Sequence, residues 1–273
     1  MKRWIVGCLV GGLLPGAALA QMAGDTPLRT LEPGAAGSAW QAVGRLNLDQ
    51  MGFCTATLIA PDRVLTAAHC LFDPETGARI DDSALEFLAG WRIGHAEAIR
   101  GVRRAAIAPE FRMADARTLS RVASDLAILQ LDQPIRLNGA APFAVAAQPP
   151  DRGAAVAVVS YARGRESAPS LQDRCTVLDR FDEGVVVMSC SIDSGASGAP
   201  VFAIEQGTPR IVAVFSAMAE SAGTPISLGM RLDTQIARLM AELDQPQAPV
   251  QRLRSTPAPG AEGARATARF LRP

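Results

Sequence analysis

The chain alternates short apolar runs with turn-forming residues along most of its length. Runs of valine, isoleucine, leucine and alanine are separated by glycine, proline and aspartate, which is typical of β-strands joined by turns. The strands predicted for the first half are residues 43–48, 53–60, 63–66, 85–88 and 126–131. Those predicted for the second half are residues 154–161, 175–178, 185–190, 201–204, 211–216 and 226–232. About six strands in each half favour two antiparallel barrels or sandwiches.

One segment near the end of this region has a helical pattern instead. Asp233 is a suitable N-cap. Apolar residues then recur at helical spacing and would share one face of a helix, namely Ile236, Leu239, Met240 and Leu243. We therefore expect a short C-terminal helix that lies on the second half.

The first twenty residues have the features of a secretory signal peptide. A basic start at Lys2 and Arg3 precedes an apolar stretch and an A-x-A site, so cleavage is expected before Gln21. Lipid attachment at Cys8 is disfavoured because the apolar run before it is too short. No later segment approaches eighteen uninterrupted apolar residues, so we expect no membrane span and an exported protein, periplasmic or extracellular.

The strand-rich domain is expected to cover residues 40–245, with a short segment before it and a tail after it. Residues 21–39 are an N-terminal extension or a removable pro-segment. Residues 246–273 are rich in proline, alanine and arginine and indicate a disordered tail.

Export changes the cysteine count, because loss of Cys8 leaves an even number of cysteines. The four are Cys54, Cys70, Cys175 and Cys190. In an oxidising compartment they indicate two disulfides. Three pairings are possible, and 54–70 with 175–190 is favoured because each bridge is local to one half; four buried thiols are the alternative.

Composition indicates a globular protein without a nucleic-acid partner. Of the 273 residues, 48% are hydrophobic and 20% are charged, which suits a packed core. The 27 basic and 27 acidic residues balance, so there is no basic field for nucleic acid. No ligand cluster suggests a metal or a cofactor, and we expect a monomer.

The stretch DSGASGAP at residues 193–200 raises the question of what Ser197 does among such small neighbours. A serine in a turn is usually just solvated, whereas a nucleophilic serine needs a base, a group that orients the base and an oxyanion site. The chain has two histidines. His69 directly follows a predicted strand and precedes a cysteine, and His95 lies in a polar turn, where a structural role is expected.

Three motifs taken together resemble those of the chymotrypsin-fold, trypsin-like serine proteases. They are TAAHC at residues 66–70, DLAIL at 125–129 and GASGAP at 195–200, in that order. The resemblance implies an all-β fold of two six-stranded antiparallel barrels with a short C-terminal helix. His69 and Asp125 would come from the first barrel, Ser197 from the second, and the substrate would bind in the cleft between them.

The resemblance also implies a role for each of these side chains. His69 would take the Ser197 proton during attack on a carbonyl, and Asp125 would hold the imidazole in the required tautomer. The backbone N–H groups of Gly195 and Ser197 would stabilise the negative charge on the carbonyl oxygen. Glycine suits this loop because it permits the required backbone geometry.

Two positions depart from the animal digestive members of this family. The first is the residue before the serine. In the digestive enzymes it is acidic and pairs with a new N-terminus, whereas in this chain it is Ala196. The nearest N-terminal counterpart, AVGR at residues 42–45, has no cleavage arginine immediately ahead, so this activation switch is expected to be absent, as in exported bacterial members. The second departure is Ala199, where glycine is commoner.

The sequence gives only a coarse expectation of specificity. The residue six before Ser197, at the base of the primary pocket, is Ser191 and not aspartate, so a preference for arginine or lysine is not supported. Asp193 is nearby. Ser216 stands where a serine usually contacts the triad aspartate, and Met218 would add bulk to the pocket wall. We expect small or apolar side chains to be accepted.

The motifs therefore favour an exported serine endopeptidase that acts through an acyl-enzyme on protein or peptide substrates. Two other functions remain possible on the same fold. One is a pseudoprotease, a binding module that keeps the fold and the triad but whose cleft is occluded, and the other is a non-peptidase acyl hydrolase that uses the same triad.

Overall fold

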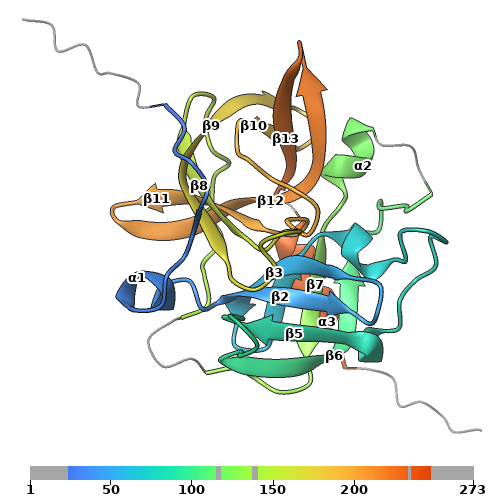
Figure 1. Ribbon diagram of the computed structural model, residues 1–273. Coiled ribbons are helices and arrows are strands. Elements are labelled where there is room, and N and C mark those ends of the chain that lie inside the picture. Colours follow the sequence, from blue (N-terminus) through green and yellow to red (C-terminus); the bar gives the residue numbers. More distant parts are fainter. Residues whose placement is uncertain (1–23, 115–117, 137–140, 233–234, 247–273) are drawn as a thin grey trace, which may run out of the picture.

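The computed structural model describes residues 24–114, 118–136, 141–232 and 235–246. Its strands form two barrels, one blue to green and the other yellow to orange in Figure 1. The predicted signal peptide, the predicted tail beyond residue 246 and the predicted cap Asp233 lie outside the described residues.

The first barrel has six antiparallel strands whose apolar side chains point inward. They are β2 (Val43–Leu48), β3 (Phe53–Ala60), β4 (Arg63–Thr66), β5 (Leu85–Ala89), β6 (Ala98–Ile107) and β7 (Ala127–Leu131). The barrel closes in the order β2-β3-β4-β7-β6-β5. Leu46, Leu58, Leu65, Phe87 and Ile128 are buried in this barrel.

The second barrel also has six antiparallel strands. They are β8 (Ala155–Ser160), β9 (Ser170–Phe181), β10 (Val185–Met188), β11 (Pro200–Glu205), β12 (Thr208–Ser221) and β13 (Thr224–Arg231). They are hydrogen-bonded in the order β9-β10-β13-β12-β11-β8, and β8 pairs with β9 to close the barrel. Val158, Val177, Val201, Ala213 and Phe215 form part of its core. The predicted pair of six-stranded barrels is confirmed.

Strand boundaries follow the apolar pattern where that pattern is regular. The strands predicted at residues 43–48, 53–60 and 63–66 are present with those bounds. Strand β6 was missed because arginines interrupt its apolar positions in the sequence AIRGVRRAAI. Strands β9 and β12 run past their predicted ends, since backbone pairing continues through polar residues that carry no apolar signal.

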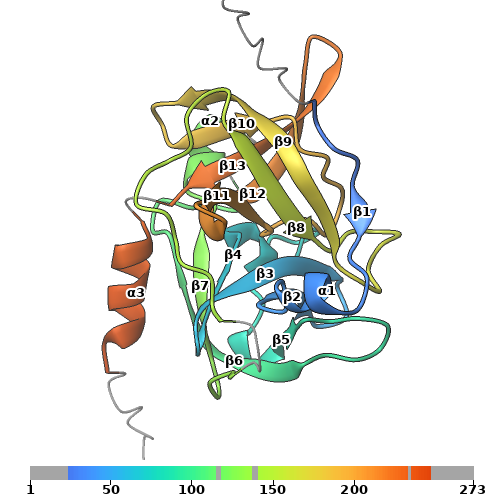
Figure 2. The same ribbon diagram turned by 90° about the vertical axis from the view of Figure 1, so that its left-hand side faces the viewer.

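The segment before the first barrel is packed against the second one. Strand β1 (Arg29–Thr30) pairs antiparallel with β9, and Figure 2 shows it beside that strand. Thr26 donates from its N–H and its hydroxyl to the Arg174 carbonyl, at 2.9 and 3.2 Å. Leu31 is fully buried. Residues 25–31 are thus part of the packed structure.

The C-terminal helix α3 (Ile236–Asp244) is present, but its predicted location was wrong. It packs on β6 and β7 of the first barrel and not on the second half (Figure 2). Leu239 and Leu243 are buried there, and Asp244 forms an ion pair with Arg63 at 2.8 Å. Apolar periodicity determines which face of a helix is buried, but not which surface covers it.

Short helical segments lie in the connections between strands. They are α1 (Ala35–Ser38), α2 (Leu119–Ala123) and the 3-10 turns Ala68–Leu71 and Asp82–Ala84. Among the described residues, no helix has the length and apolar character that crossing a bilayer requires.

Both favoured disulfides are present. Cys54 on β3 is linked to Cys70 in the turn after β4, and Cys175 on β9 is linked to Cys190 just after β10. Each bridge fastens a segment next to the cleft to the barrel that carries it.

Candidate active site

His69 lies in the 3-10 turn that follows β4. The Ala68 N–H donates to the Asp125 carbonyl at 3.2 Å, and the disulfide of Cys70 ties the same turn to β3. The short strand and the disulfide together fix the backbone position of His69. Its side chain remains 22% exposed.

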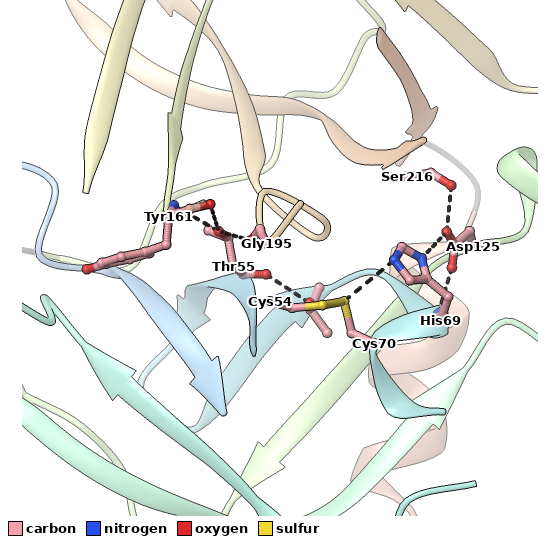
Figure 3. Close-up of a disulfide and its surroundings, with 9 residues drawn as sticks. Cys54, Thr55, His69, Cys70, Asp125, Tyr161, Gly195 and Ser216 are labelled. Carbon is pink, nitrogen blue, oxygen red and sulfur yellow. Dashed lines mark hydrogen bonds and ion pairs between the residues drawn. A yellow bond between two sulfur atoms is a disulfide. The ribbon is translucent and has the colours of Figure 1, made fainter. Parts of the chain in front are cut away.

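Asp125 lies between α2 and β7, and its carboxylate is nearly fully buried. Oδ1 accepts the His69 backbone N–H at 2.8 Å, and Oδ2 accepts from His69 Nδ1 at 2.6 Å. The Ser216 hydroxyl donates to Oδ2 at 2.5 Å. Figure 3 shows these groups in a row from the imidazole to Ser216. Three donors therefore satisfy a carboxylate that burial would otherwise penalise.

This arrangement selects the state of the imidazole ring. A proton on Nδ1 satisfies the Asp125 carboxylate, so the other ring nitrogen, Nε2, carries the free lone pair. Nε2 lies 4.0 Å from Cys70 Sγ, beside the disulfide. In this tautomer Nε2 can accept a proton, and His69 is among the residues that line the cleft described below.

Ser197 lies in the loop between β10 and β11. Thr55 of the first barrel makes two hydrogen bonds to this loop. The Thr55 N–H donates to the Ser197 carbonyl at 2.9 Å, and the Thr55 hydroxyl donates to the Gly195 carbonyl at 3.0 Å. On the other side, the Gly198 N–H donates to the Phe215 carbonyl on β12 at 2.9 Å. The loop is thus fixed to both barrels.

The two glycines in this loop are required by backbone conformation and by space. Gly195 has φ +96°, and a Cβ there would lie 2.5 Å from Phe53 Cε2. Gly198 has φ +78°, and a Cβ there would lie 2.2 Å from Thr66 Oγ1. Any larger residue would push the loop away from the first barrel.

The backbone N–H groups of Gly195 and Ser197 are left without acceptors. Within the described part of the chain, neither donates a hydrogen bond, whereas Ala196 and Gly198 both do. Ala196 donates to the Asp193 carbonyl at 2.9 Å. The loop therefore offers two donors, and unpaired N–H groups of this kind can bind the oxygen of a polarised carbonyl.

Ser197, His69 and Asp125 line one cleft of about 200 Å³. Its other lining residues are Arg121, Val122, Ile192, Asp193, Ser194, Phe215, Ser216, Ala217 and Met218. Among the described residues, the Ser197 hydroxyl makes no hydrogen bond to the imidazole. Such contacts are often long in a free enzyme and shorten when substrate is bound.

Of the three residues predicted to form the substrate pocket, two line the cleft and one does not. Ser216 and Met218 line the cleft, and Met218 is 56% exposed at its rim. Ser191 is exposed and does not line the cleft; its N–H donates to Gln172 Oε1 at 2.8 Å. The next residues along the chain, Ile192 and Asp193, line the cleft instead.

The two positions that depart from the digestive members are both buried alanines. Ala196 and Ala199 have no exposed surface, and Val43 is buried at the start of β2. His95 is exposed in a turn and exchanges two backbone hydrogen bonds with Arg92.

Thr55 and Gln172 were not identified from the sequence, although both support the loop. Gln172 is buried on β9 and links the Ser191 N–H to the Thr26 carbonyl, to which its Nε2 donates at 2.9 Å. A polar residue at an inward position of a strand was the available signal, but it does not reveal the partner.

Two other features near or beyond the cleft do not add to this chemistry. Cys54, His69 and Cys70 are close enough to suggest metal ligands, but both sulfurs belong to the disulfide and are not thiolates. A larger hollow of about 390 Å³ lies between α2 and α3, and the Glu110–Arg238 ion pair lies on its wall.

Comparison with known families agrees with this geometry. The profile of the trypsin-like peptidase domain matches residues 54–214, which include His69, Asp125 and Ser197. The chain belongs to the trypsin-like peptidase family. No curated protein matches this trypsin-like peptidase significantly.

One solved structure with the same fold is a Glu endopeptidase in complex with MPD. Its TM-score is 0.64 at 18% sequence identity, and the match covers 81% of this chain and 98% of that chain. At this identity the likeness supports the fold of the trypsin-like peptidase and not its specificity.

Proposed function

We propose that the protein is an exported serine endopeptidase that cleaves peptide bonds through an acyl-enzyme. Ser197 attacks the carbonyl, His69 takes and returns the proton, and Asp125 orients the imidazole. The observation that carries the proposal is the hold of the buried Asp125 carboxylate on His69 Nδ1 at 2.6 Å, in a cleft that Ser197 also lines.

The oxyanion site of this mechanism is formed by the N–H groups of Gly195 and Ser197. Their lack of other acceptors among the described residues supports this assignment. Donors already in place cost no reorganisation when charge develops on the carbonyl oxygen, and the loss of one typically costs ~3–4 kcal/mol.

The side chain on the acyl side of the scissile bond is proposed to be small or apolar. Ile192, Phe215, Ala217 and Met218 give the cleft an apolar wall. Asp193 is the acidic residue of the lining outside the triad, and it is exposed. The open cleft, with Met218 at its rim, supports catalysis over a function in binding alone.

Export is proposed from the predicted signal peptide. The two disulfides support it, because such bridges form and persist in oxidising compartments.

The test is labelling of the purified protein with a fluorophosphonate, followed by mass mapping of the adduct. The probe reacts with serines that are activated by a base and an oxyanion site, so stoichiometric labelling at Ser197 is expected. Ser197→Ala should abolish labelling. Ser194→Ala is the matched control, because this exposed serine lines the same cleft. A folded wild-type protein that is not labelled would refute the proposed mechanism.

A second measurement separates the endopeptidase from an acyl hydrolase. Wild-type protein is incubated with small esters and with a proteome-derived peptide library. Cleavage of internal peptide bonds, lost in Ser197→Ala, is the expected result. Ester turnover without any peptide cleavage would favour the non-peptidase hydrolase.

A further inference from the structure

Arg45 on β2 presents a guanidinium group beside the oxyanion loop. Its Cζ lies 4.4 Å from the centre of the Phe53 ring and 6.0 Å from that of Trp91. The Arg45 side chain makes no hydrogen bond or ion pair with another described residue, and its Nε is buried without a partner. Glu166 is an electrostatic neighbour, but it is not within ion-pair distance.

The strand register brings this guanidinium close to Gly195. Arg45 is directly opposite Thr55 in the β2–β3 pair, so the two side chains project from the same face. Thr55 donates to the Gly195 carbonyl, and the edge of the Phe53 ring packs against Gly195. The Arg45 guanidinium lies over that ring, beside Gly195 and outside the lining of the cleft of about 200 Å³ itself.

The position of Arg45 relative to the cleft indicates which part of a peptide it meets. Figure 3 shows Gly195 on the opposite side of the imidazole from Ser216. A peptide whose carbonyl oxygen binds at Gly195 and Ser197 can place its acyl side along Ser216 and Met218. Its leaving-group side then runs over Phe53 and the Cys54–Cys70 bridge. An extended chain advances roughly 3.3 Å per residue, so on this path the first or second residue after the scissile bond would be the one nearest Phe53 and the guanidinium above it.

Desolvation makes this arginine a suitable carboxylate receptor. Burial lowers the pKa of Arg45, and the charge of Glu166 opposes that shift. A guanidinium stays protonated and offers a planar pair of donors that match a carboxylate, and the Phe53 ring holds that plane in place. Partial removal from water strengthens the attraction of such a group for an anion.

We propose that Arg45, held over Phe53, binds a carboxylate on the leaving-group side of the scissile bond. The protein then favours substrates with aspartate or glutamate at the first or second position after that bond. A free C-terminal carboxylate at this place would supply the same chemistry. The inference rests on the proposed peptidase function and adds a specificity-determining residue to it.

The experiment begins with the cleavage sites of the wild-type protein in a proteome-derived peptide library. Aspartate and glutamate should be enriched at the first or second position after the cleaved bond. From one cleaved sequence, peptides are then made with Glu or Gln at that position, each with a free and an amidated C-terminus. Amidation separates a terminal carboxylate from a side-chain carboxylate.

Arg45→Gln should lower kcat/KM for the Glu peptide about tenfold and leave the Gln peptide nearly unchanged, because a charge-assisted contact is lost. Arg45→Glu should transfer the preference to a Lys peptide. Arg103→Gln is the matched control, since Arg103 is an exposed arginine on β6. Fluorophosphonate labelling of Ser197 should be equal in all variants, which shows that the catalytic groups are intact.

Acidic enrichment that persists in Arg45→Gln, or its absence in a wild-type protein that cleaves peptides, would overturn this inference alone. A fall in kcat/KM for both peptides equally would assign Arg45 a structural role and would also overturn it. A wild-type protein that cleaves no peptide would overturn the proposed function together with the inference.

Discussion

Thr55 of the first barrel is hydrogen-bonded to the Ser197 loop of the second barrel. Removing its hydroxyl therefore tests directly whether this contact supports the candidate site. The Gly195 carbonyl at 3.0 Å and the Tyr161 carbonyl at 3.3 Å share the single proton of this hydroxyl, and its oxygen accepts from the Tyr161 N–H at 3.0 Å. Thr55 is fully buried. Thr55→Val keeps the shape of the side chain and removes these three contacts together.

The expected loss of stability follows from the groups that are left behind. The Tyr161 N–H and the Gly195 carbonyl both lose a partner, and an unsatisfied buried group costs ~1–3 kcal/mol. Gly195 is partly exposed, so water offsets some of its share. We expect the free energy of unfolding of Thr55→Val to fall by about 2–4 kcal/mol. Thr57→Val, whose hydroxyl donates once to the Ala42 carbonyl at 3.2 Å, should lose about 1 kcal/mol.

Two measurements on these variants separate stability from function. Urea unfolding gives the free energies, and the rate of fluorophosphonate labelling at Ser197 reports on the loop that carries Gly195 and Ser197. Labelling of Thr55→Val should slow about tenfold, since the Gly195 peptide is no longer fixed. Thr57→Val, on the same strand, should label at the wild-type rate. Thr55→Ser retains a hydroxyl and should recover most of the loss.

Equal labelling rates in Thr55→Val and Thr57→Val would refute this reasoning, even if Thr55→Val were less stable. That result would mean that the Ser197 loop keeps its geometry without the hydroxyl of Thr55.

Three further predictions concern the support of Asp125 and the N-terminal segment. Ser216→Ala removes a donor to the buried Asp125 carboxylate, so fluorophosphonate labelling should slow about tenfold and the free energy of unfolding in urea should fall by about 1–3 kcal/mol. Leu31→Ala should lower the free energy of unfolding by about 2–4 kcal/mol in urea, because Leu31 is fully buried. The neighbouring Thr26 side chain and the Arg29 guanidinium, which lies 3.2 Å from Asp173 Oδ2, hold the pKa of Asp173 below its ordinary value of 3.8. That stabilisation is therefore present above this pH and is lost as the pH falls through the folded value. The melting temperature of the wild-type protein should fall more steeply than that of Asp173→Asn on going from pH 5 to pH 3.

Each of these predictions has an outcome that contradicts it. An unchanged labelling rate in Ser216→Ala would mean that His69 alone orients Asp125. Leu178→Ala is the control for Leu31→Ala, since Leu178 is 36% exposed, and equal losses would mean that the N-terminal segment adds nothing to the core. Parallel pH curves for wild type and Asp173→Asn would remove Asp173 from the acid response.

Where the apolar pattern was regular, the sequence predicted the strands well. Strands β2, β3 and β4 were predicted with their bounds because each is a short run rich in apolar residues, and the turns at residues 49–52 and 61–62 separate them. Strand β6 was missed because arginines occupy positions that face solvent or the helix α3. The β1 strand is only Arg29–Thr30, and pairing with β9, not composition, makes it a strand.

Of the candidate site, the motifs identified the candidate catalytic side chains but not the groups that support them. His69, Asp125 and Ser197 were found because each lies in a short motif of its own. Thr55 and Gln172 lie in ordinary strand sequence, and their roles depend on partners more than a hundred residues away, such as Gly195. A contact between residues so far apart in the chain cannot be predicted from the sequence around either of them.

The sequence by itself indicated the strand-rich architecture, favoured the two disulfides and pointed to the three candidate catalytic residues, because these follow from short apolar runs between turns, cysteine spacing and short motifs. The tertiary structure decided what those residues face. It placed α3 on the first barrel, took Ser191 out of the cleft lining and brought Arg45 over Phe53 beside Gly195. The physical reason is that closure of the barrels sets which side chains meet across strands and loops. This register depends on the pairing of distant segments, so no single segment predicts it.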